Sequence, residues 1–252
     1  MKPPRRRLDQ LLLDRGMVES REKAKALILA GQVMVSGQRV DKAGAPVADD
    51  SPVELLEQLP YVSRGGYKLA GALDGFGIDV TGLVCADIGA STGGFTDCLL
   101  QRGAARVHAV DVGRGQLHWK LRTDPRVVLH ESVNARYLKP SLIGEPAGFA
   151  CCDVSFISVT LVIPAVAALL APARRMVILV KPQFEARRGE VGKGGIVRDA
   201  AVRQAACDRV QAAVTGLGFE TRLMESPIAG AEGNIEYLLY GFDPHSRSHL
   251  QT

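Results

Sequence analysis

One stretch of the chain, at residues 84–96, is Val-Cys-Ala-Asp-Ile-Gly-Ala-Ser-Thr-Gly-Gly-Phe-Thr. It predicts a buried strand that ends in a glycine-rich turn and continues into a helix. Glycines allow the backbone to approach a ligand closely, and the first strand–helix turn of a doubly wound sheet is where a nucleotide-like ligand binds. The glycines at 89, 93 and 94 match neither the dinucleotide fingerprint nor the phosphate-binding loop, which disfavours a diphosphate ligand.

Further strand-like apolar runs follow, and helical patterns fill most of the gaps between them. The runs lie at residues 83–88, 106–110, 127–129, 149–152, 176–180, 219–223 and 235–240. This alternation predicts an α/β fold, a doubly wound and largely parallel seven-stranded sheet with helices on both faces. Hydrophobic residues make up 46% of the chain, which is typical of a globular protein rather than a disordered or low-complexity one.

The basic charge is concentrated at the start of the chain. Residues 1–42 contain ten Lys or Arg and five acids, whereas the rest contains 21 and 22. Such an excess indicates a polyanionic partner, most simply nucleic acid, although a solvated basic surface is the alternative.

The same segment predicts a small α+β unit. Two helices are expected, one ended by Gly16 and one capped by Ser20 and ended by Gly31, followed by short strands at 33–35 and 39–40. We therefore divide the chain into a basic N-terminal domain at 1–48, a linker at 49–62, a strand–helix domain at 63–243 and a tail at 244–252.

The N-terminal unit resembles the RNA-binding domain first seen in ribosomal protein S-four. The resemblance is carried by Arg7-Leu8-Asp9, Ser20-Arg21-Glu22-Lys23-Ala24 and Val33-x-Val35-x-Gly37. In that family the paired helices carry Arg and Lys to RNA phosphates. The resemblance thus implies as RNA-binding residues Arg5, Arg6, Arg7, Arg15, Arg21, Lys23, Lys25 and Arg39.

The glycine-rich turn resembles the S-adenosylmethionine loop of seven-stranded methyltransferases. Asp111 ends the next strand, where an acid can accept both ribose hydroxyls, and Asn134 follows the third, where such enzymes contact the adenine edge. A glycine turn alone can be purely structural, but these two residues favour cofactor binding. The implied cofactor is S-adenosylmethionine, and its expected ligands are Asp87, Gly89, Ala90, Ser91, Thr92, Gly93, Gly94, Phe95, Asp111, Val112 and Asn134.

Four charged residues stand where a core would favour apolar ones: Lys68, Asp153, Lys181 and Glu236. Asp153 and Lys181 each end an apolar strand, and the carboxyl ends of strands face the ligand crevice of a doubly wound sheet. Each residue alone would more often be part of a surface ion pair.

Together the four resemble the Lys-Asp-Lys-Glu tetrad of ribose 2′-O-methyltransferases related to the heat-shock RNA methyltransferase, the FtsJ-like enzymes. With the basic unit in front, the chain is similar to the TlyA family of ribosomal RNA 2′-O-methyltransferases, whose members are also called haemolysins. The most specific strings are at residues 62–69, 87–96, 152–158 and 180–185. The resemblance implies methylation of cytidine in 16S or 23S ribosomal RNA, with ribosomal RNA or ribosomal subunits as the partner.

The chemistry of a ribose 2′-hydroxyl explains such a tetrad. The hydroxyl is a weak acid, so a base must take its proton as the methyl group arrives. Lysine can do this only as the free amine, and a second ammonium and partial burial disfavour the charged form. We assign Lys181 as the base, Lys68 and Asp153 as the groups that tune and orient it, and Glu236 as the group that positions Lys68 or the ribose.

A glycine-rich basic segment follows Phe184. We interpret it as a lid over the RNA, with a plain flexible loop as the alternative. The further RNA contacts expected in the catalytic domain are Arg64, Arg187, Arg188 and Lys193.

Other classes of function fit the sequence less well. Five cysteines without a C-x-x-C pair argue against a disulfide framework or a zinc finger, and we expect no metal. Cys151 and Cys152 are expected to be buried, which disfavours cytosine C5 methylation. No signal peptide or membrane span is visible, which indicates a cytoplasmic protein. The rival hypotheses are a membrane-active haemolysin and a non-catalytic RNA-binding or ribosome-assembly factor.

Overall fold

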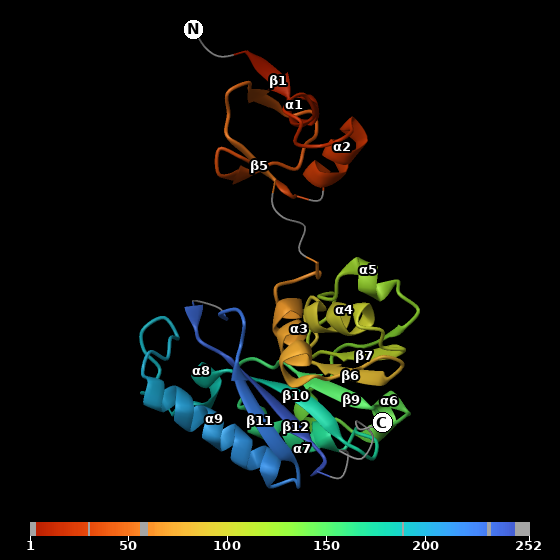
Figure 1. Cartoon of the computed structure of the whole chain (residues 1–252), viewed down its shortest axis with the longest axis vertical. Coiled ribbons are helices and arrows are strands. Elements are labelled where there is room, and N and C mark those ends of the chain that lie inside the picture. The colour runs from red at the N-terminus through yellow and green to blue at the C-terminus, as the bar shows by residue number, and fades with distance from the viewer. Residues whose placement is uncertain (1–3, 30, 56–59, 188, 231–232, 245–252) are drawn as a thin grey trace. The chain divides into compact units, whose positions relative to one another are not determined.

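A computed structural model describes residues 4–29, 31–55, 60–187, 189–230 and 233–244 (Figure 1). The chain forms two compact units, residues 1–59 and 60–252. Each unit encloses its own hydrophobic core. Residues 245–252 of the expected tail and 56–59 of the expected linker lie outside the described residues.

The N-terminal unit contains the two expected helices, α1 (Leu8–Asp14) and α2 (Arg21–Leu29), and the two expected strands, β2 (Val33–Val35) and β3 (Gln38–Arg39). The Ser20 hydroxyl accepts a hydrogen bond from the Lys23 N–H at 3.1 Å, which confirms the predicted cap. Apolar residues of both helices and of β2 form the core: Leu8, Leu11, Leu12, Ala24, Ile28 and Val33.

Three more strands in this unit did not follow from the sequence: β1 (Arg5–Arg7), β4 (Pro46–Ala48) and β5 (Val53–Leu55). β1 pairs antiparallel with β4, and β5 pairs antiparallel with β2. Part of the expected linker is therefore a strand. Three residues are too few to show a periodic pattern, and these strands form through pairing with distant segments.

The second unit contains the predicted seven-stranded sheet, in the order β11-β12-β10-β9-β6-β7-β8 (Figure 1). β12 runs antiparallel to both of its neighbours, and the other pairings are parallel. The strands are β6 (Val84–Ile88), β7 (Arg106–Val110), β8 (Val127–His130), β9 (Phe149–Cys152), β10 (Arg175–Val180), β11 (Glu220–Glu225) and β12 (Tyr237–Phe242). Their bounds differ from the expected ones by at most two residues.

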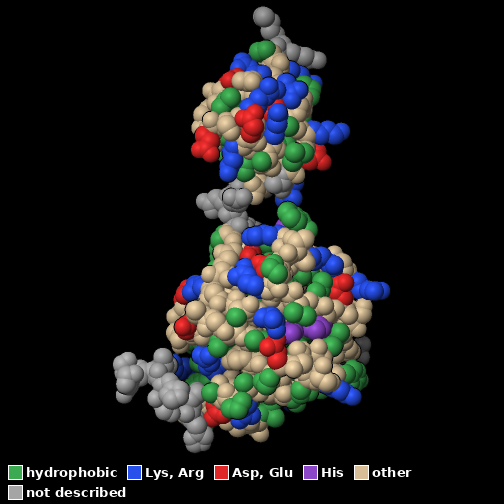
Figure 2. All heavy atoms as spheres, turned by 90° about the vertical axis from the view of Figure 1, so that its right-hand side faces the viewer, with side chains coloured by type: hydrophobic (Ala, Val, Ile, Leu, Met, Phe, Trp, Pro, Cys, Tyr) green, Lys and Arg blue, Asp and Glu red, His purple; other side chains and the backbone are tan. Residues whose placement is uncertain are grey.

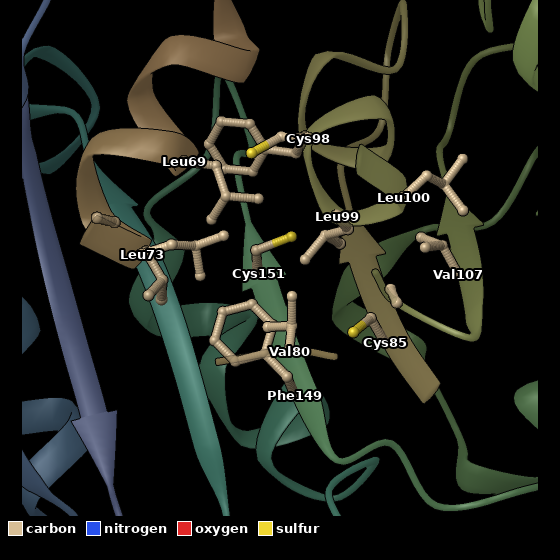
Figure 3. Packing of buried hydrophobic residues seen from close by; sticks show 14 of the residues in the cluster. Leu69, Leu73, Val80, Cys85, Cys98, Leu99, Leu100, Val107, Phe149 and Cys151 are labelled. Carbon is tan, nitrogen blue, oxygen red and sulfur yellow. The ribbon is translucent and has the colours of Figure 1, made fainter. Parts of the chain in front are cut away.

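Helices cover both faces of this sheet. They are α3 (Gly65–Phe76), α4 (Gly94–Gln101), α5 (Trp119–Arg122), α6 (Pro140–Ile143), α7 (Ile163–Ala167), α8 (Pro182–Glu185) and α9 (Ala200–Thr215), with short 3-10 turns η1 (Ala135–Tyr137) and η2 (Val159–Leu161). Successive strand residues face opposite cores, as Cys151 and Cys152 show. Figure 3 shows one of these cores, in which Leu69 and Leu73 of α3 and Leu99 of α4 pack over Cys151.

No helix in the described part of the chain is long and apolar enough to cross a membrane.

The sheet places the carboxyl ends of β6, β7, β9 and β10 at one edge of the second unit. The polar residues that follow these strands meet there.

Candidate active site

The glycine-rich turn between β6 and α4 lies directly against the end of β9. Gly89 has a φ of +87°, and a Cβ at this position would lie 2.2 Å from the carbonyl oxygen of Asp153. A side chain would therefore clash with backbone as well as strain the turn. The turn is held in place by this close approach.

Asp87 lies beneath the turn rather than in a cavity. Its side chain is fully buried, and the Thr96 hydroxyl donates a hydrogen bond to it at 2.6 Å. Burial, opposed by the Thr96 contact and reinforced by the charge of Asp153, raises the pKa of Asp87 to about 7. The hydrogen bond between Thr96 and Asp87 thus links α4 to β6.

A cavity of about 440 Å³ opens beside the turn, at the ends of β6, β7 and β9. Asp111 lines it, and its carboxylate accepts hydrogen bonds from the N–H groups of Ser91 and Gly113, both at 2.7 Å. Asn134 lines it too, and its side-chain oxygen accepts from the Arg136 N–H at 3.0 Å. Of the expected cofactor ligands, the cavity lining includes Gly89, Ser91, Asp111, Val112 and Asn134.

A smaller cavity of about 160 Å³ shares Gly89, Ser91 and Asp153 with the first. Lys68 contributes to its wall from α3. The expected ligands Ala90, Thr92, Gly94 and Phe95 line this second cavity, whereas Asp87 and Gly93 line neither. The two cavities therefore meet where the turn approaches Asp153.

The four charged residues form two ion pairs at this end of the sheet. Lys181 Nζ lies 2.5 Å from Asp153 Oδ1, and Lys68 Nζ lies 2.5 Å from Glu236 Oε2. The second pair is almost wholly buried, with Lys68 9% and Glu236 2% exposed. Because Lys68 and Asp153 line the same small cavity, the pairs adjoin one another. The expected strand at 235–240 included Glu236, but β12 begins at Tyr237, so Glu236 lies just before the strand.

Three neighbours of these pairs were not singled out from the sequence. The Ser155 hydroxyl accepts a hydrogen bond from Lys181 Nζ at 2.8 Å. Glu185, 4% exposed, accepts from the Ser158 hydroxyl at 2.5 Å and from the Val159 N–H at 2.6 Å. These contacts join the segment after β10 to the loop after β9. Ser155 and Glu185 lie in the strings at 152–158 and 180–185 that carry the family resemblance. The sequence does not reveal their contacts, because these join segments that are distant along the chain.

Phe156 is the third of these neighbours. Its side chain is 92% exposed, its φ is +65°, and its ring centroid lies 5.3 Å from that of Phe184. A non-glycine residue in this conformation is strained, and such strain is often found at functional sites. The loop thus presents an aromatic side chain to solvent beside Phe184, whose ring centroid lies 5.9 Å from Lys181 Nζ.

The basic residues of the N-terminal unit fall into two groups. Four have contacts within the unit: Arg6 pairs with Asp14 and Asp49, Arg7 and Arg21 pair with Asp9, and Arg15 donates to the carbonyls of Asp49 and Ser51. The hydrogen bond from Arg7, aided by Arg21, lowers the pKa of the Asp9 carboxyl to about 2. The other four, Arg5, Lys23, Lys25 and Arg39, are exposed, as Arg6, Arg7 and Arg15 are, so the two groups differ in their contacts and not in their exposure.

Figure 2 shows basic and acidic side chains interspersed on the visible face of the N-terminal unit.

In the second unit, residues 60–252, which we call the catalytic unit, Arg64 donates to the carbonyl of Ala229 at 3.2 Å. Arg187 and Lys193 are exposed, and Arg188 lies outside the described residues.

The structure also bears on metal and cysteine chemistry. Within the described ranges, no group of three or more His, Cys, Asp or Glu side chains is arranged to hold a metal ion. Cys151 and Cys152 are buried as expected, and burial raises the pKa of both thiols far above the usual range. Neither thiol is placed to act as a nucleophile.

Comparison with known proteins shows the family of each unit. Residues 61–242 match the FtsJ-like methyltransferase family, and residues 6–51 match the S4 domain. Hemolysin A of Brachyspira hyodysenteriae is 45% identical over 93% of this chain and 98% of its own. The 16S/23S rRNA (cytidine-2'-O)-methyltransferase TlyA of Mycobacterium tuberculosis is 44% identical over 94% of this chain and 89% of its own.

The chain belongs to the TlyA family of FtsJ-like methyltransferases. A solved Streptococcus thermophilus structure with a hemolysin designation is 45% identical, with a TM-score of 0.73, and covers 95% of this chain and 89% of that one. A Listeria monocytogenes structure designated an S-adenosylmethionine-dependent methyltransferase is only 15% identical, with a TM-score of 0.50, over 70% of this chain and 99% of that one. The second likeness shows the fold alone.

Replacing Asp87 tests its buried environment. An unfolded aspartate titrates near pH 4, whereas Asp87 in the fold titrates at about 7. Between these values the folded state holds the proton and the unfolded state does not, so the free energy of unfolding falls as the pH rises. Asp87→Asn removes this titration, and we expect the variant to gain stability relative to the parent from about pH 4 to about pH 7. Urea unfolding followed by circular dichroism measures the difference. A difference that is constant across this range would contradict the assignment.

Proposed function

We propose that this protein transfers a methyl group from S-adenosylmethionine to a ribose 2′-hydroxyl of ribosomal RNA. The observation that carries the proposal is the meeting of the two ion pairs, Lys181–Asp153 and Lys68–Glu236, beside the glycine-rich turn. The name of the M. tuberculosis relative supports cytidine in 16S or 23S ribosomal RNA as the target.

The cavity beside the turn suits a nucleoside-containing cofactor. A carboxylate can accept about four hydrogen bonds, so Asp111 retains capacity for ribose hydroxyls beyond its two backbone donors. Asn134 would contact the adenine, and the turn from Gly89 to Phe95 would hold the rest of the cofactor. The bound cofactor supplies a methyl group already activated by its sulfonium, so the protein's contribution is alignment and removal of a proton.

In the proposed reaction, Lys181 takes the proton of the 2′-hydroxyl. Its Nζ atom is oriented by Asp153 at 2.5 Å and by Ser155 at 2.8 Å. Lys68, held by Glu236, lines the smaller cavity together with Asp153, the partner of Lys181, and would position the ribose there. Phe156 offers an exposed ring on which the base of the target nucleotide can stack.

RNA would be held by both units. The exposed Arg5, Lys23, Lys25 and Arg39 are the candidates for phosphate contacts in the N-terminal unit, and Arg187 and Lys193 in the catalytic unit. The direct test is incorporation of labelled methyl groups from S-adenosylmethionine into ribosomal subunits, with the 2′-O-methyl positions mapped. RNA binding without incorporation would favour the non-catalytic RNA-binding factor.

Lys181→Ala and Lys181→Arg should both abolish methyl transfer and leave cofactor affinity nearly unchanged. A guanidinium cannot lose its proton near neutral pH, so the arginine variant tests the base role without removing the charge. Lys139→Arg, at an exposed position of the same unit, is the matched control and should remain active. An active Lys181→Arg enzyme would overturn the assignment of the base.

Asp111→Ala should weaken binding of S-adenosylmethionine by about 1–3 kcal/mol, the range for hydrogen bonds to a charged group. Isothermal titration measures the affinity, and circular dichroism verifies that the turn still folds without its two backbone contacts. Asp74→Ala, which removes a surface partner of Arg102, is the control. Equal affinities for the parent and Asp111→Ala would place the cofactor elsewhere.

Replacing Arg5, Lys23 and Lys25 together with glutamine should weaken RNA binding and make its salt dependence shallower. The slope of log affinity against log salt should fall by about 0.9 for each lost phosphate contact on duplex-like RNA. Arg7 and Arg21 are unsuitable for this test, because they neutralise the buried Asp9 and their loss would also destabilise the unit. An unchanged slope would mean that the N-terminal unit does not carry these phosphate contacts.

A further inference from the structure

The surface formed by residues 112–122, which we call the α5 surface, exposes two large apolar side chains, Val112 at the rim of the larger cavity and Trp119 beyond it. Trp119 is the only tryptophan of the chain, and its side chain is 71% exposed. Val112 is 70% exposed. In Figure 1, α5 lies at the periphery of the catalytic unit. Tryptophan is enriched at interaction surfaces, because its ring supplies a large apolar contact area.

The charge of the α5 surface is of one sign. Residues 112–122 contain Arg114, Lys120 and Arg122 and no acid. Lys120 has a side-chain exposure of 62%, its ammonium lies 4.0 Å from the largely buried Asp97, and Asp124 is a further acidic neighbour. Arg122 is paired with Glu131, so Arg114 and Lys120 are the cations best placed to meet an external anion. Exposed cations beside an exposed tryptophan ring suit a partner that carries both negative charges and aromatic rings. RNA with unpaired bases has both features.

The α5 surface is also fixed to the candidate active site. The His118 N–H donates to the carbonyl of Thr92 in the glycine-rich turn at 3.1 Å. Gly93 has a φ of +96°, and a Cβ there would lie 2.3 Å from Leu121 Cδ1, so the turn and α5 are in direct contact. Val112 and Gln116 line the larger cavity. A strand of RNA whose ribose reaches Lys181 therefore has this surface close by.

We propose that the α5 surface is an RNA-contact surface of the catalytic unit, where Trp119 stacks on an unpaired base and Arg114 and Lys120 contact phosphates of the same strand. The inference rests on the proposed function in taking RNA as the substrate. It adds a contact outside the cavities and the N-terminal unit. The surface favours single-stranded over duplex RNA, because only an unpaired base offers its ring face for stacking.

Trp119 itself reports on the proposal, because no other tryptophan contributes to the fluorescence of the intact protein. Adding an oligocytidylate of about 12 nucleotides should quench its emission to saturation, and a duplex RNA of the same length should quench it less. Emission that is blue-shifted without RNA and insensitive to it would mean that part of the protein already covers Trp119, and would overturn the proposal.

Binding of labelled oligocytidylate to full-length variants provides the second measurement. Trp119→Ala should weaken binding by about tenfold, as expected for loss of one base–aromatic stack, whereas Trp119→Phe should stay close to the parent. Arg114→Gln should weaken binding and make the salt slope shallower. Arg222→Gln, an exposed arginine on β11 at the opposite edge of the sheet, is its matched control and should do neither.

The outcomes separate the inference from the proposed function. Parental affinity in both Trp119→Ala and Arg114→Gln, with methylation of ribosomal RNA by the parent intact, would refute the α5 surface and leave the proposed function standing. Quenching and affinity loss as expected, without methylation by the parent, would support the surface while refuting the enzyme.

Discussion

A buried charge must be paired, and this requirement shapes the end of the sheet where the site lies. Lys68 and Glu236 are nearly inaccessible to water, so each needs the other to be tolerated inside the protein. They come from α3 and from the residue before β12, which are 168 positions apart. β12 can supply Glu236 because it runs antiparallel to its neighbours, which brings its amino end to the edge where the parallel strands have their carboxyl ends. The reversed strand is thus what completes the cluster.

Much of this arrangement could be predicted from the sequence. Apolar runs bounded by helical patterns predict the strands of the sheet, and the rule that ligands bind at strand carboxyl ends predicts that Asp153 and Lys181 lie together. The resemblance to the family also implied Asp153 as a partner of Lys181 and Glu236 as a partner of Lys68 or the ribose, and both pairs are present. The contacts of Ser155 and Glu185 could not be predicted in the same way. That Lys181 contacts Ser155, or that Glu185 holds the loop after β9, depends on side-chain directions between distant segments. The three-residue strands of the N-terminal unit were missed for a related reason, because long-range pairing rather than periodicity creates them.

The charge composition of the N-terminal unit predicts the kind of partner that the unit binds, but it does not predict which basic residues are available to that partner. The excess of basic residues before position 43 marks a polyanion-binding unit, but Arg7 and Arg21 are engaged by the buried Asp9, and Arg15 by backbone carbonyls. A sequence cannot separate an arginine that neutralises an internal carboxylate from one that projects into solvent. An arginine engaged in this way must give up its internal partner to bind a phosphate, so the affinity available from phosphate contacts is smaller than the basic count suggests.

The two aspartates at the ends of β6 and β9 show how position decides what a carboxyl group can do. Asp87 and Asp153 lie on adjacent strands, yet Asp87 is buried with a hydroxyl and a thiol as neighbours, whereas Asp153 has the ammonium of Lys181. Burial without a cation favours the neutral acid, which is why the pKa of Asp87 rises to about 7. Asp87 holds Thr96 at the start of α4. The carboxylate paired with Lys181 is that of Asp153, whose backbone also meets Gly89, so that the turn and the proposed base contact the same residue.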